Sequence, residues 1–292
     1  MNILSWNCRG LGQPRTVQEL VRLVRASCPK LVFIMETRQH KERVVNLKYR
    51  LGYKNCFTVE SGNKGGGLVL FWDDSIKLDI LSYGLHHIDA LIWDENHHAK
   101  WRCTCVYGEP RTQDRSHMWE LIRRIKPRTA APWLMIGDFN ETMWSFEHFS
   151  KRRRPERQMF DFREILSYCD LHDLGFSGIP WTYDNKQEGE RNVKVRLDRA
   201  VASPQWSDWF PNVRVKHLMS SRSDHCPILL ATTPEEEERQ KSRILRYEIM
   251  WEREESLPDE IKKAWDVGNR ILNLGDIARL PCADGVLINL GQ

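Results

Sequence analysis

The pattern that most constrains the fold is a change of hydrophobic period along the chain. Residues 54–107 contain successive segments in which apolar and polar residues alternate, as in half-buried strands joined by short turns. On either side, short apolar runs alternate with stretches whose apolar residues recur at helical spacing. Two such series predict two sheets packed face to face with helices outside. We therefore expect a four-layer α/β (α+β) sandwich with two mostly antiparallel sheets.

The expected elements can be placed by residue number. Strands are predicted over residues 2–6, 31–35, 68–72, 76–80, 88–92, 101–107, 133–136, 181–183, 193–197, 213–218 and 227–231. Helices are predicted around residues 16–24, 41–51, 113–125 and 162–169. A run of four acids at 235–238 marks the clearest boundary. We expect one domain over residues 1–233 and a charged linker with a partly helical tail, without a second core, over residues 234–292.

Composition and targeting signals favour an intracellular protein. The chain holds no apolar run near the roughly 20 residues that span a bilayer. The residues after Met1 show neither the basic nor the apolar region of a secretory signal, so we expect none. Eight cysteines are scattered without a CxxC pair, which predicts buried free thiols in a reducing compartment, the cytosol or the nucleus. We expect a monomer that does not bind membranes.

The net charge of +4 is concentrated in one segment. Residues 151–157 carry five positive side chains and one negative one. Such a run can attract a polyanion such as nucleic acid, or it can be a solvated loop with no partner. The sequence leaves these two interpretations open.

Several polar residues stand at the ends of the predicted strands, where catalytic side chains are often held on loops by a rigid scaffold. Taken singly, such a residue is usually a turn former or a cap. Together they supply carboxylates, carboxamides, a phenol and an imidazole. The residues are Asn7, Glu36, Tyr107, Asp138, Asn140, Asp198, Asp224 and His225.

This set of side chains suits phosphodiester hydrolysis. Hard oxygen ligands such as Glu36 and Asn7 favour Mg²⁺, with Mn²⁺ as a substitute, over zinc. A carboxylate or an imidazole can position and deprotonate the attacking water. Neutral donors such as Asn140 and Tyr107 can stabilise charge that develops on the phosphoryl oxygens. Other histidines, in pairs at 86–87 and 97–98, are expected to face solvent.

A series of short motifs occurs in one order along the chain. They are Ser5-Trp6-Asn7, Ile34-Met35-Glu36-Thr37, Val106-Tyr107-Gly108, Ile136-Gly137-Asp138-Phe139-Asn140, Trp181-Thr182, Arg196-Leu197-Asp198-Arg199 and Ser223-Asp224-His225. This series resembles the signature blocks of the endonuclease/exonuclease/phosphatase superfamily, which has the DNase-I-like fold. The opening Trp6–Gly12 is most similar to endonuclease domains of plant LINE-type non-LTR retrotransposons. The resemblance runs from Met1 to about Thr232, and no reverse transcriptase sequence follows.

The resemblance implies a role for each matching residue. Glu36 and Asn7 would hold Mg²⁺, and Asp138 would align the attacking water. Asn140 and Tyr107 would contact the phosphate. Asp198 would orient His225, which would bind the scissile phosphate, and Asp224 would lie beside the metal. Either Asp138 or His225 could serve as the general base.

The resemblance also implies a DNA endonuclease that nicks one strand and leaves a 3′-hydroxyl and a 5′-phosphate, which favours the nucleus as its location. Abasic-site nucleases carry Asp where this chain has Arg9, a residue that cannot bind Mg²⁺. A second metal and abasic-site specificity are therefore in doubt. The alternatives are a catalytically idle transposon relic that binds nucleic acid or nothing, a phosphomonoesterase acting on inositol phosphates, and a nuclease acting on RNA.

Overall fold

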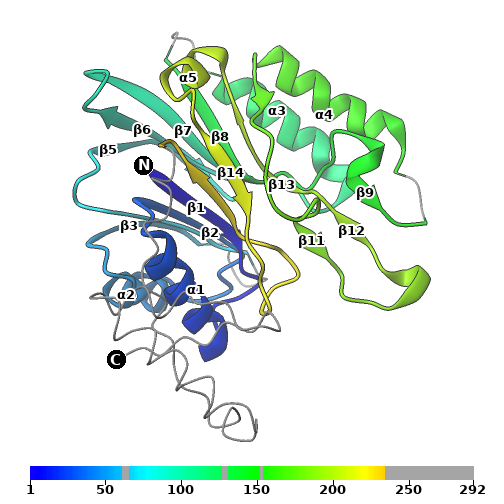
Figure 1. Ribbon diagram of the computed structural model, residues 1–292, viewed down its shortest axis with the longest axis horizontal. Helices are drawn as coiled ribbons and strands as arrows, with labels where there is room; N and C mark the ends of the chain where they lie inside the picture. The colour runs from blue at the N-terminus through cyan, green and yellow to red at the C-terminus, as the bar shows by residue number, and fades with distance from the viewer. Residues whose placement is uncertain (61–65, 127–130, 152–153, 234–292) are drawn as a thin grey trace, which may run out of the picture. The chain divides into compact units, whose positions relative to one another are not determined.

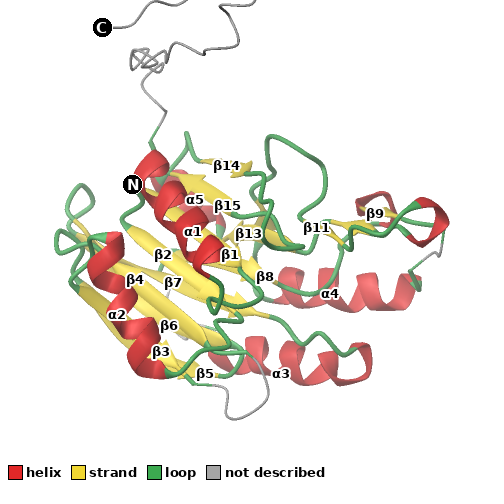
Figure 2. Ribbon diagram, turned by 90° about the horizontal axis from the view of Figure 1, so that it is seen from below, coloured by secondary structure: helices red, strands yellow, loops and turns green. Residues whose placement is uncertain are grey.

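The computed structural model describes residues 1–60, 66–126, 131–151 and 154–233. Two six-stranded sheets lie face to face, and two helices cover the outer face of each (Figures 1 and 2). The helices are α1 (Pro14–Ser27) and α2 (Lys41–Leu51) on one side, and α3 (Arg115–Ile125) and α4 (Glu156–Tyr168) on the other. The predicted α/β sandwich is confirmed. The tail predicted at 234–292 lies outside the described residues.

The first sheet joins the two ends of the described chain. Its order is β14-β15-β1-β2-β4-β3, and only β1 and β2 at its centre are parallel. The strands are β1 (Asn2–Asn7), β2 (Leu31–Met35), β3 (Asn55–Val59), β4 (Leu68–Trp72), β14 (Arg214–His217) and β15 (Ile228–Ala231). Strand β3 lies at the edge and was not predicted as a separate strand.

The second sheet has the order β10-β13-β8-β7-β6-β5, and again only the central pair, β7 and β8, is parallel. The strands are β5 (Leu78–Gly84), β6 (His87–Asp94), β7 (Ala99–Tyr107), β8 (Trp133–Asp138), β10 (His172–Asp173) and β13 (Asp198–Ala202). A small third sheet contains β9 (His148–Phe149), β11 (Tyr183–Asp184) and β12 (Lys194–Val195), and extends beyond the second sheet (Figure 1). Short helices are α5 (Pro204–Trp209) and single 3₁₀ turns at Thr112–Asp114, Ser145–Glu147 and Gly189–Arg191.

The two parallel pairs determine where the polar strand ends meet. Asn7 is in register with Met35 at the ends of β1 and β2, and Tyr107 is in register with Asp138 at the ends of β7 and β8. Parallel strands bring their carboxyl ends to the same edge of a sheet. Each sheet therefore presents polar residues from two strands at one edge.

Three apolar clusters hold the layers together. The cluster between the sheets includes Phe33 from β2 and Trp101 from β7, both buried. Outside the first sheet, α1 and α2 bury apolar residues such as Leu20 against β1 and β2. Outside the second, α3 and α4 bury residues such as Phe162 against β7, β8 and β13. Each sheet is thus covered on both faces, which explains the continuous apolar runs of its central strands.

Some sequence predictions are corrected by the structure. The strand predicted over 193–197 is shorter, because β12 covers only Lys194–Val195. Asp198 therefore does not follow a strand; it is the first residue of β13. His87 does not face solvent but is buried on β6. Helix α5 was not predicted, although its residue Trp206 is fully buried against Trp101 with ring centroids 5.8 Å apart.

The described residues contain no helix that is both long and apolar enough to cross a bilayer. The cysteines within them are free thiols, as the sequence predicted. Cys8, Cys103, Cys105 and Cys169 are buried, Cys56 and Cys226 are half-buried, and Cys28 is exposed, contrary to the predicted burial.

Candidate active site

Glu36 lies directly after β2, buried where the two sheets meet. Its Oε1 accepts hydrogen bonds from Asn7 Nδ2 at 3.0 Å and from Tyr107 Oη at 3.1 Å. Asn7 belongs to the first sheet and Tyr107 to the second, so the carboxylate joins the two sheets. The geometry therefore brings together three of the residues that the strand ends singled out.

Two arginines also bind this carboxylate. Arg9 Nη1 lies 3.2 Å from Glu36 Oε1, and Arg38 Nη2 donates to Oε2. The second guanidinium nitrogen of Arg9 lies 3.0 Å from Asp224 Oδ2, so Arg9 bridges two carboxylates. Burial opposes ionisation of Glu36, but the hydrogen bond from Asn7 and the two guanidinium groups hold its pKa below the ordinary value. Glu36 is thus a carboxylate near neutral pH.

Asp138 ends β8 and lies fully buried beside Asn7. Its Oδ2 accepts from Asn7 Nδ2 at 3.0 Å, and its Oδ1 accepts from the backbone N–H of Asn140 at 2.8 Å. Asn140 also donates through Nδ2 to the carbonyl of Gly108 at 2.9 Å. Burial and the neighbouring charge of Asp198 raise the pKa of Asp138 to about 6. A carboxylate with such a pKa can accept a proton at neutral pH.

His225 pairs with Asp198 next to Asp138. The ring Nδ1 lies 2.9 Å from Asp198 Oδ2 and 3.8 Å from Asp138 Oδ2. Burial disfavours the charged ring, but the charges of Asp198 and Asp138 outweigh it and raise the pKa of His225 to about 9. The site therefore favours an imidazolium whose Nδ1–H is held by Asp198.

Buried polar contacts fix this pair in place. Thr182 Oγ1 accepts the backbone N–H of Asp198 at 2.8 Å, and Ser223 Oγ accepts the backbone N–H of His225 at 3.0 Å. Ser223 in turn donates to the carbonyl of Asn7 at 2.8 Å, which connects the β14–β15 loop to β1. The motif residues Thr182 and Ser223 are therefore positioning residues.

The backbone is strained around Glu36 and Asn140. Four residues here, Arg9, Glu36, Arg38 and Asn140, have φ between +49° and +54°, the left-handed region that residues other than glycine rarely adopt. Such conformations cost about 1–3 kcal/mol each and persist where the surroundings impose them, often at functional sites. These residues lie in the loops that follow β1, β2 and β8, beside the strand ends that carry the candidate site residues.

Glu36 and Asn7 form the first of two groups of side chains here that could hold a divalent cation. They offer hard oxygen donors of the kind that Mg²⁺ prefers. A second cluster, formed by Asp138, Asp198 and His225, also has ligand atoms within 4.8 Å of one another. The contact between the imidazole and Asp198, and the raised pKa values of Asp138 and His225, suit that cluster to acid–base chemistry.

The structure thus joins five of the eight predicted site residues by hydrogen bonds: Asn7, Glu36, Tyr107, Asp138 and Asn140. The hydrogen-bonded pair of His225 and Asp198 lies beside them, with His225 Nδ1 3.8 Å from Asp138, and Asp224 joins the group through Arg9. Sequence reasoning missed Arg38 as a partner of Glu36. Its position two residues after Glu36, in the loop that follows β2, is the sequence feature that could have indicated this contact. From the sequence, Arg9 is identified only as a residue that cannot bind a metal.

A buried ion network supports the strand that carries Asp198. Arg199, fully buried, pairs with Asp173 at 2.7 Å and with Glu147 at 2.9 Å, and Arg196 pairs with the same two carboxylates. These contacts join β10, β13 and the turn before β9. The two arginines that flank Asp198 in its motif are therefore structural.

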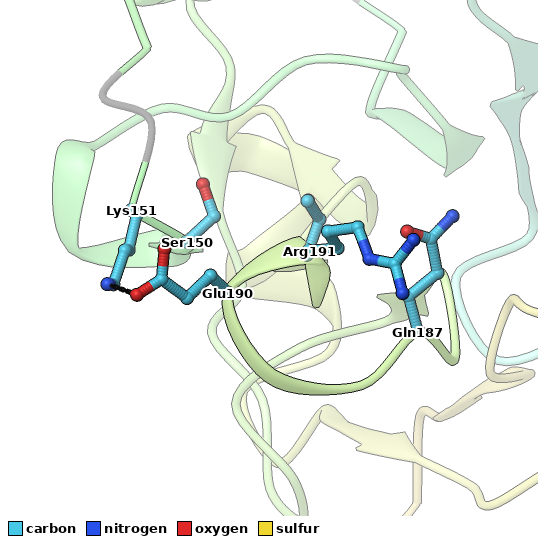
Figure 3. Close-up of a pocket in the computed structure, with 6 residues that line it drawn as sticks. Ser150, Lys151, Gln187, Glu190 and Arg191 are labelled. Atoms are coloured by element: carbon cyan, nitrogen blue, oxygen red, sulfur yellow. Dashed lines mark hydrogen bonds and ion pairs between the residues drawn. The ribbon is translucent and has the colours of Figure 1, made fainter.

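The basic run at 151–157 is partly neutralised. Lys151 pairs with Glu190 beside a cavity of about 270 Å³ on the small third sheet (Figure 3). Arg154 pairs with the buried Glu141 at 2.5 Å and donates to the carbonyl of Asn140 at 3.3 Å. Residues 152 and 153 lie outside the described residues. The buried partner favours a structural role for Arg154, whereas the ion pair of Lys151 is exposed to solvent.

Two packed sheets flanked by helices are the fold of a class of nucleases and phosphatases. The chain belongs to the endonuclease/exonuclease/phosphatase family, whose sequence profile matches residues 4–225. The superfamily expected from the sequence is therefore confirmed. No curated relative matches the sequence significantly.

Solved structures of the same fold include three nucleic-acid enzymes. The endonuclease domain of TRAS1, a telomere-specific non-LTR retrotransposon, is 16% identical with a TM-score of 0.57, covering 78% of this chain and 96% of its own. The AP endonuclease LMAP from Leishmania major is 15% identical with a TM-score of 0.62, covering 78% and 86%. The 3′ phosphatase NExo from Neisseria, bound to product DNA hairpin, is 17% identical with a TM-score of 0.59, covering 79% and 98%. At these identities the likeness concerns the fold alone.

Proposed function

We propose that the protein is a Mg²⁺-dependent DNA endonuclease that nicks one strand and leaves a 3′-hydroxyl and a 5′-phosphate. The proposal depends on one observation: oxygen ligands for a cation lie next to residues that can transfer protons. Glu36 and Asn7 supply the oxygen ligands, and Asn7 also donates a 3.0 Å hydrogen bond to Asp138. Asp138 and His225 form the acid–base group. A cation-binding carboxylate beside an acid–base pair suits attack of water on a phosphodiester.

The pKa values of Asp138 and His225 indicate which of the two is the general base. Asp138, with its pKa raised to about 6, is ionised at neutral pH yet basic enough to take a proton from water. His225, with its pKa raised to about 9, stays positively charged. Its Nδ1 is held by Asp198, so Nε2 is the nitrogen that can meet a phosphate oxygen. We therefore assign Asp138 as the general base and His225 as the phosphate-binding cation.

Neutral donors complete the phosphate site. Burial raises the pKa of Tyr107, so its hydroxyl remains a neutral hydrogen-bond donor at any physiological pH. Asn140 is fixed by its bonds to Asp138 and Gly108, and it offers a carboxamide at the same place. Glu36 and Asn7 would hold Mg²⁺, which when bound polarises the phosphoryl oxygen and stabilises the leaving oxygen.

DNA and a retrotransposon origin are the finer parts of this proposal. The opening Trp6–Gly12 resembles plant LINE-type endonucleases, and one structure of the same fold is a retrotransposon endonuclease domain. Arg9 stands where abasic-site nucleases carry a second acidic residue, which favours nicking of undamaged DNA with one metal ion. Action on DNA would place the protein in the nucleus, and we expect it to act as a monomer.

Supercoiled plasmid tests this proposal directly. We expect purified protein to convert it to the nicked form with Mg²⁺ and to stop when EDTA is added. Glu36→Gln and His225→Ala should each slow nicking by at least about 100-fold. The matched controls are Glu120→Gln and His117→Ala on the exposed face of α3, which should nick as the wild type does.

The same preparation separates the alternatives. Plasmid binding without nicking would identify an idle relic. Release of phosphate from inositol phosphates or from 3′-phosphorylated DNA, with no nicking, would identify a phosphomonoesterase, and cleavage of RNA in preference to plasmid would identify an RNA nuclease. Nicking that survives both active-site substitutions would contradict the assignment of residues.

A further inference from the structure

Arg9 binds the carboxylate of Glu36, the group that the proposed function assigns to the cation. One of its guanidinium nitrogens lies 3.2 Å from Glu36 Oε1 and the other 3.0 Å from Asp224 Oδ2. Glu36 also accepts from Asn7, Tyr107 and Arg38, so donors reach both of its oxygens. A divalent cation that binds Oε1 must displace one of the three donors there, because a cation and a hydrogen-bond donor cannot share one lone pair. Of the two guanidinium groups on Glu36, Arg9 is the one that contacts Oε1.

Arg9 is the more readily displaced of the two. The two arginine side chains are similarly exposed, at 41% for Arg9 and 45% for Arg38, but the 3.2 Å contact of Arg9 with Glu36 is longer than an ordinary charge-assisted hydrogen bond. Arg38, by contrast, is two residues from Glu36 in the same strained loop. Arg9 retains Asp224 as a partner when it leaves Glu36.

A cavity of about 260 Å³ lies beside this contact. Its walls include three guanidinium-bearing residues, Arg9, Arg38 and Arg222, together with the polar side chains of Gln13 and Gln39. Arg222 is exposed on the loop that also carries Asp224 and His225. Three arginines around one cavity make it chemically suited to a phosphate group.

We propose that Arg9 couples cation binding to phosphate binding. Without a cation, its guanidinium bridges Glu36 and Asp224; when a divalent cation takes Glu36, Arg9 turns into the adjacent cavity and binds a phosphate of the nucleic-acid backbone. Binding of either the cation or the phosphate breaks the ion pair between Arg9 and Glu36, so the second ligand no longer has to break it. Each ligand therefore raises the affinity for the other by the same factor. This inference rests on the proposed function, because it takes Glu36 as the cation ligand and a polynucleotide as the substrate.

The charges at the site support this coupling. Four carboxylates, those of Glu36, Asp138, Asp198 and Asp224, face the guanidinium groups of Arg9 and Arg38 and the imidazole of His225. A bound divalent cation leaves Arg9 with less negative charge to neutralise. A phosphodiester anion beside it restores the balance, which a neutral ligand would not.

Mn²⁺ affinity, measured from the electron paramagnetic resonance signal of free Mn²⁺, tests the proposal without any turnover. The titration compares wild type, Arg9→Gln and the matched control Arg22→Gln, which removes the same charge from an exposed position on α1. Each protein is measured alone, with a phosphorothioate DNA duplex that carries backbone charge and resists cleavage, and with a methylphosphonate duplex that carries none. Protein-free titrations correct for Mn²⁺ bound by the duplexes.

We expect Arg9→Gln alone to bind Mn²⁺ about five- to tenfold more tightly than wild type, since a partly exposed ion pair no longer competes. The charged duplex should tighten Mn²⁺ binding to wild type and to Arg22→Gln by about fivefold or more, and to Arg9→Gln by less than about twofold. The neutral duplex should have no effect on any of the three.

Equal or weaker Mn²⁺ binding by Arg9→Gln would overturn the coupling, as would equal tightening of Arg9→Gln and wild type by the charged duplex. Both results leave the proposed function standing. No Mn²⁺ binding by wild type would overturn the proposed function and this inference together.

Discussion

Replacing Asp198 with asparagine should lower the pKa of His225 and the rate of phosphodiester cleavage together. Burial by itself disfavours the imidazolium, and Asp198 is the first of the groups that overcome this effect. The pKa of His225 stands at about 9 against an ordinary 6.5. That difference favours the charged ring by about 3 kcal/mol. Asparagine keeps the shape of the contact and removes the charge.

In Asp198→Asn the pKa of His225 should fall to the ordinary value or below, because burial remains while the main opposing charge is gone. At pH 7.5 the ring is then mostly neutral and cannot stabilise the phosphate charge. We expect the rate at this pH to fall by about 100- to 1,000-fold, the range seen when an electrostatic donor is removed. Below the new pKa, part of the activity should return.

The pKa of His225 and the rate of nicking are measured separately. An NMR titration of the His225 ring gives its pKa, and a pH–rate profile of plasmid nicking gives the activity. Asp208→Asn, a change at an exposed carboxylate on α5, is the control and should alter neither. A His225 pKa that stays near 9 in Asp198→Asn, or a lowered pKa with an undiminished rate, would refute the reasoning.

The wild-type pH–rate profile should rise through about pH 6, as Asp138 loses its proton, and fall through about pH 9, as His225 loses its charge; a flat profile over this range would contradict the assigned roles. Gly137→Ala should lower the free energy of unfolding by about 3 kcal/mol, because its Cβ would lie 1.9 Å from the carbonyl oxygen of Val106; an unchanged urea midpoint would be inconsistent with this packing. Glu141→Gln should cost about 3 kcal/mol by leaving two guanidinium groups without their buried carboxylate, lowering Tm while the midpoints of the pH–rate profile stay in place.

The layered fold could be predicted because hydrophobic period records which faces are buried. Leu31–Met35 reads as a continuous apolar run since β2 is covered on both faces, and β5 alternates because one of its faces is open. The two-residue strands β9 and β10 are too short to leave a period in the sequence. The start of β13 was missed because Asp198 and Arg199 are charged yet buried, each paired with partners distant in sequence.

The members of the candidate site were predicted, but of their contacts only the pairing of Asp198 with His225 was. Asn7, Glu36 and Asp138 stand out because each ends an apolar strand, and the pairing of parallel strands brings such ends together. The attachment of Arg9 to both Glu36 and Asp224 depends on where three separate loops turn. Loop geometry of this kind follows from tertiary packing, which local patterns do not encode.

Anomalous diffraction from a crystal soaked in Mn²⁺ tests the central claim most directly. We predict a single strong peak about 2.1 Å from a carboxylate oxygen of Glu36, with the side chain of Asn7 beside it and Arg9 moved away from the carboxylate. A peak between Asp138, Asp198 and His225, or no peak within reach of Glu36, would contradict the account.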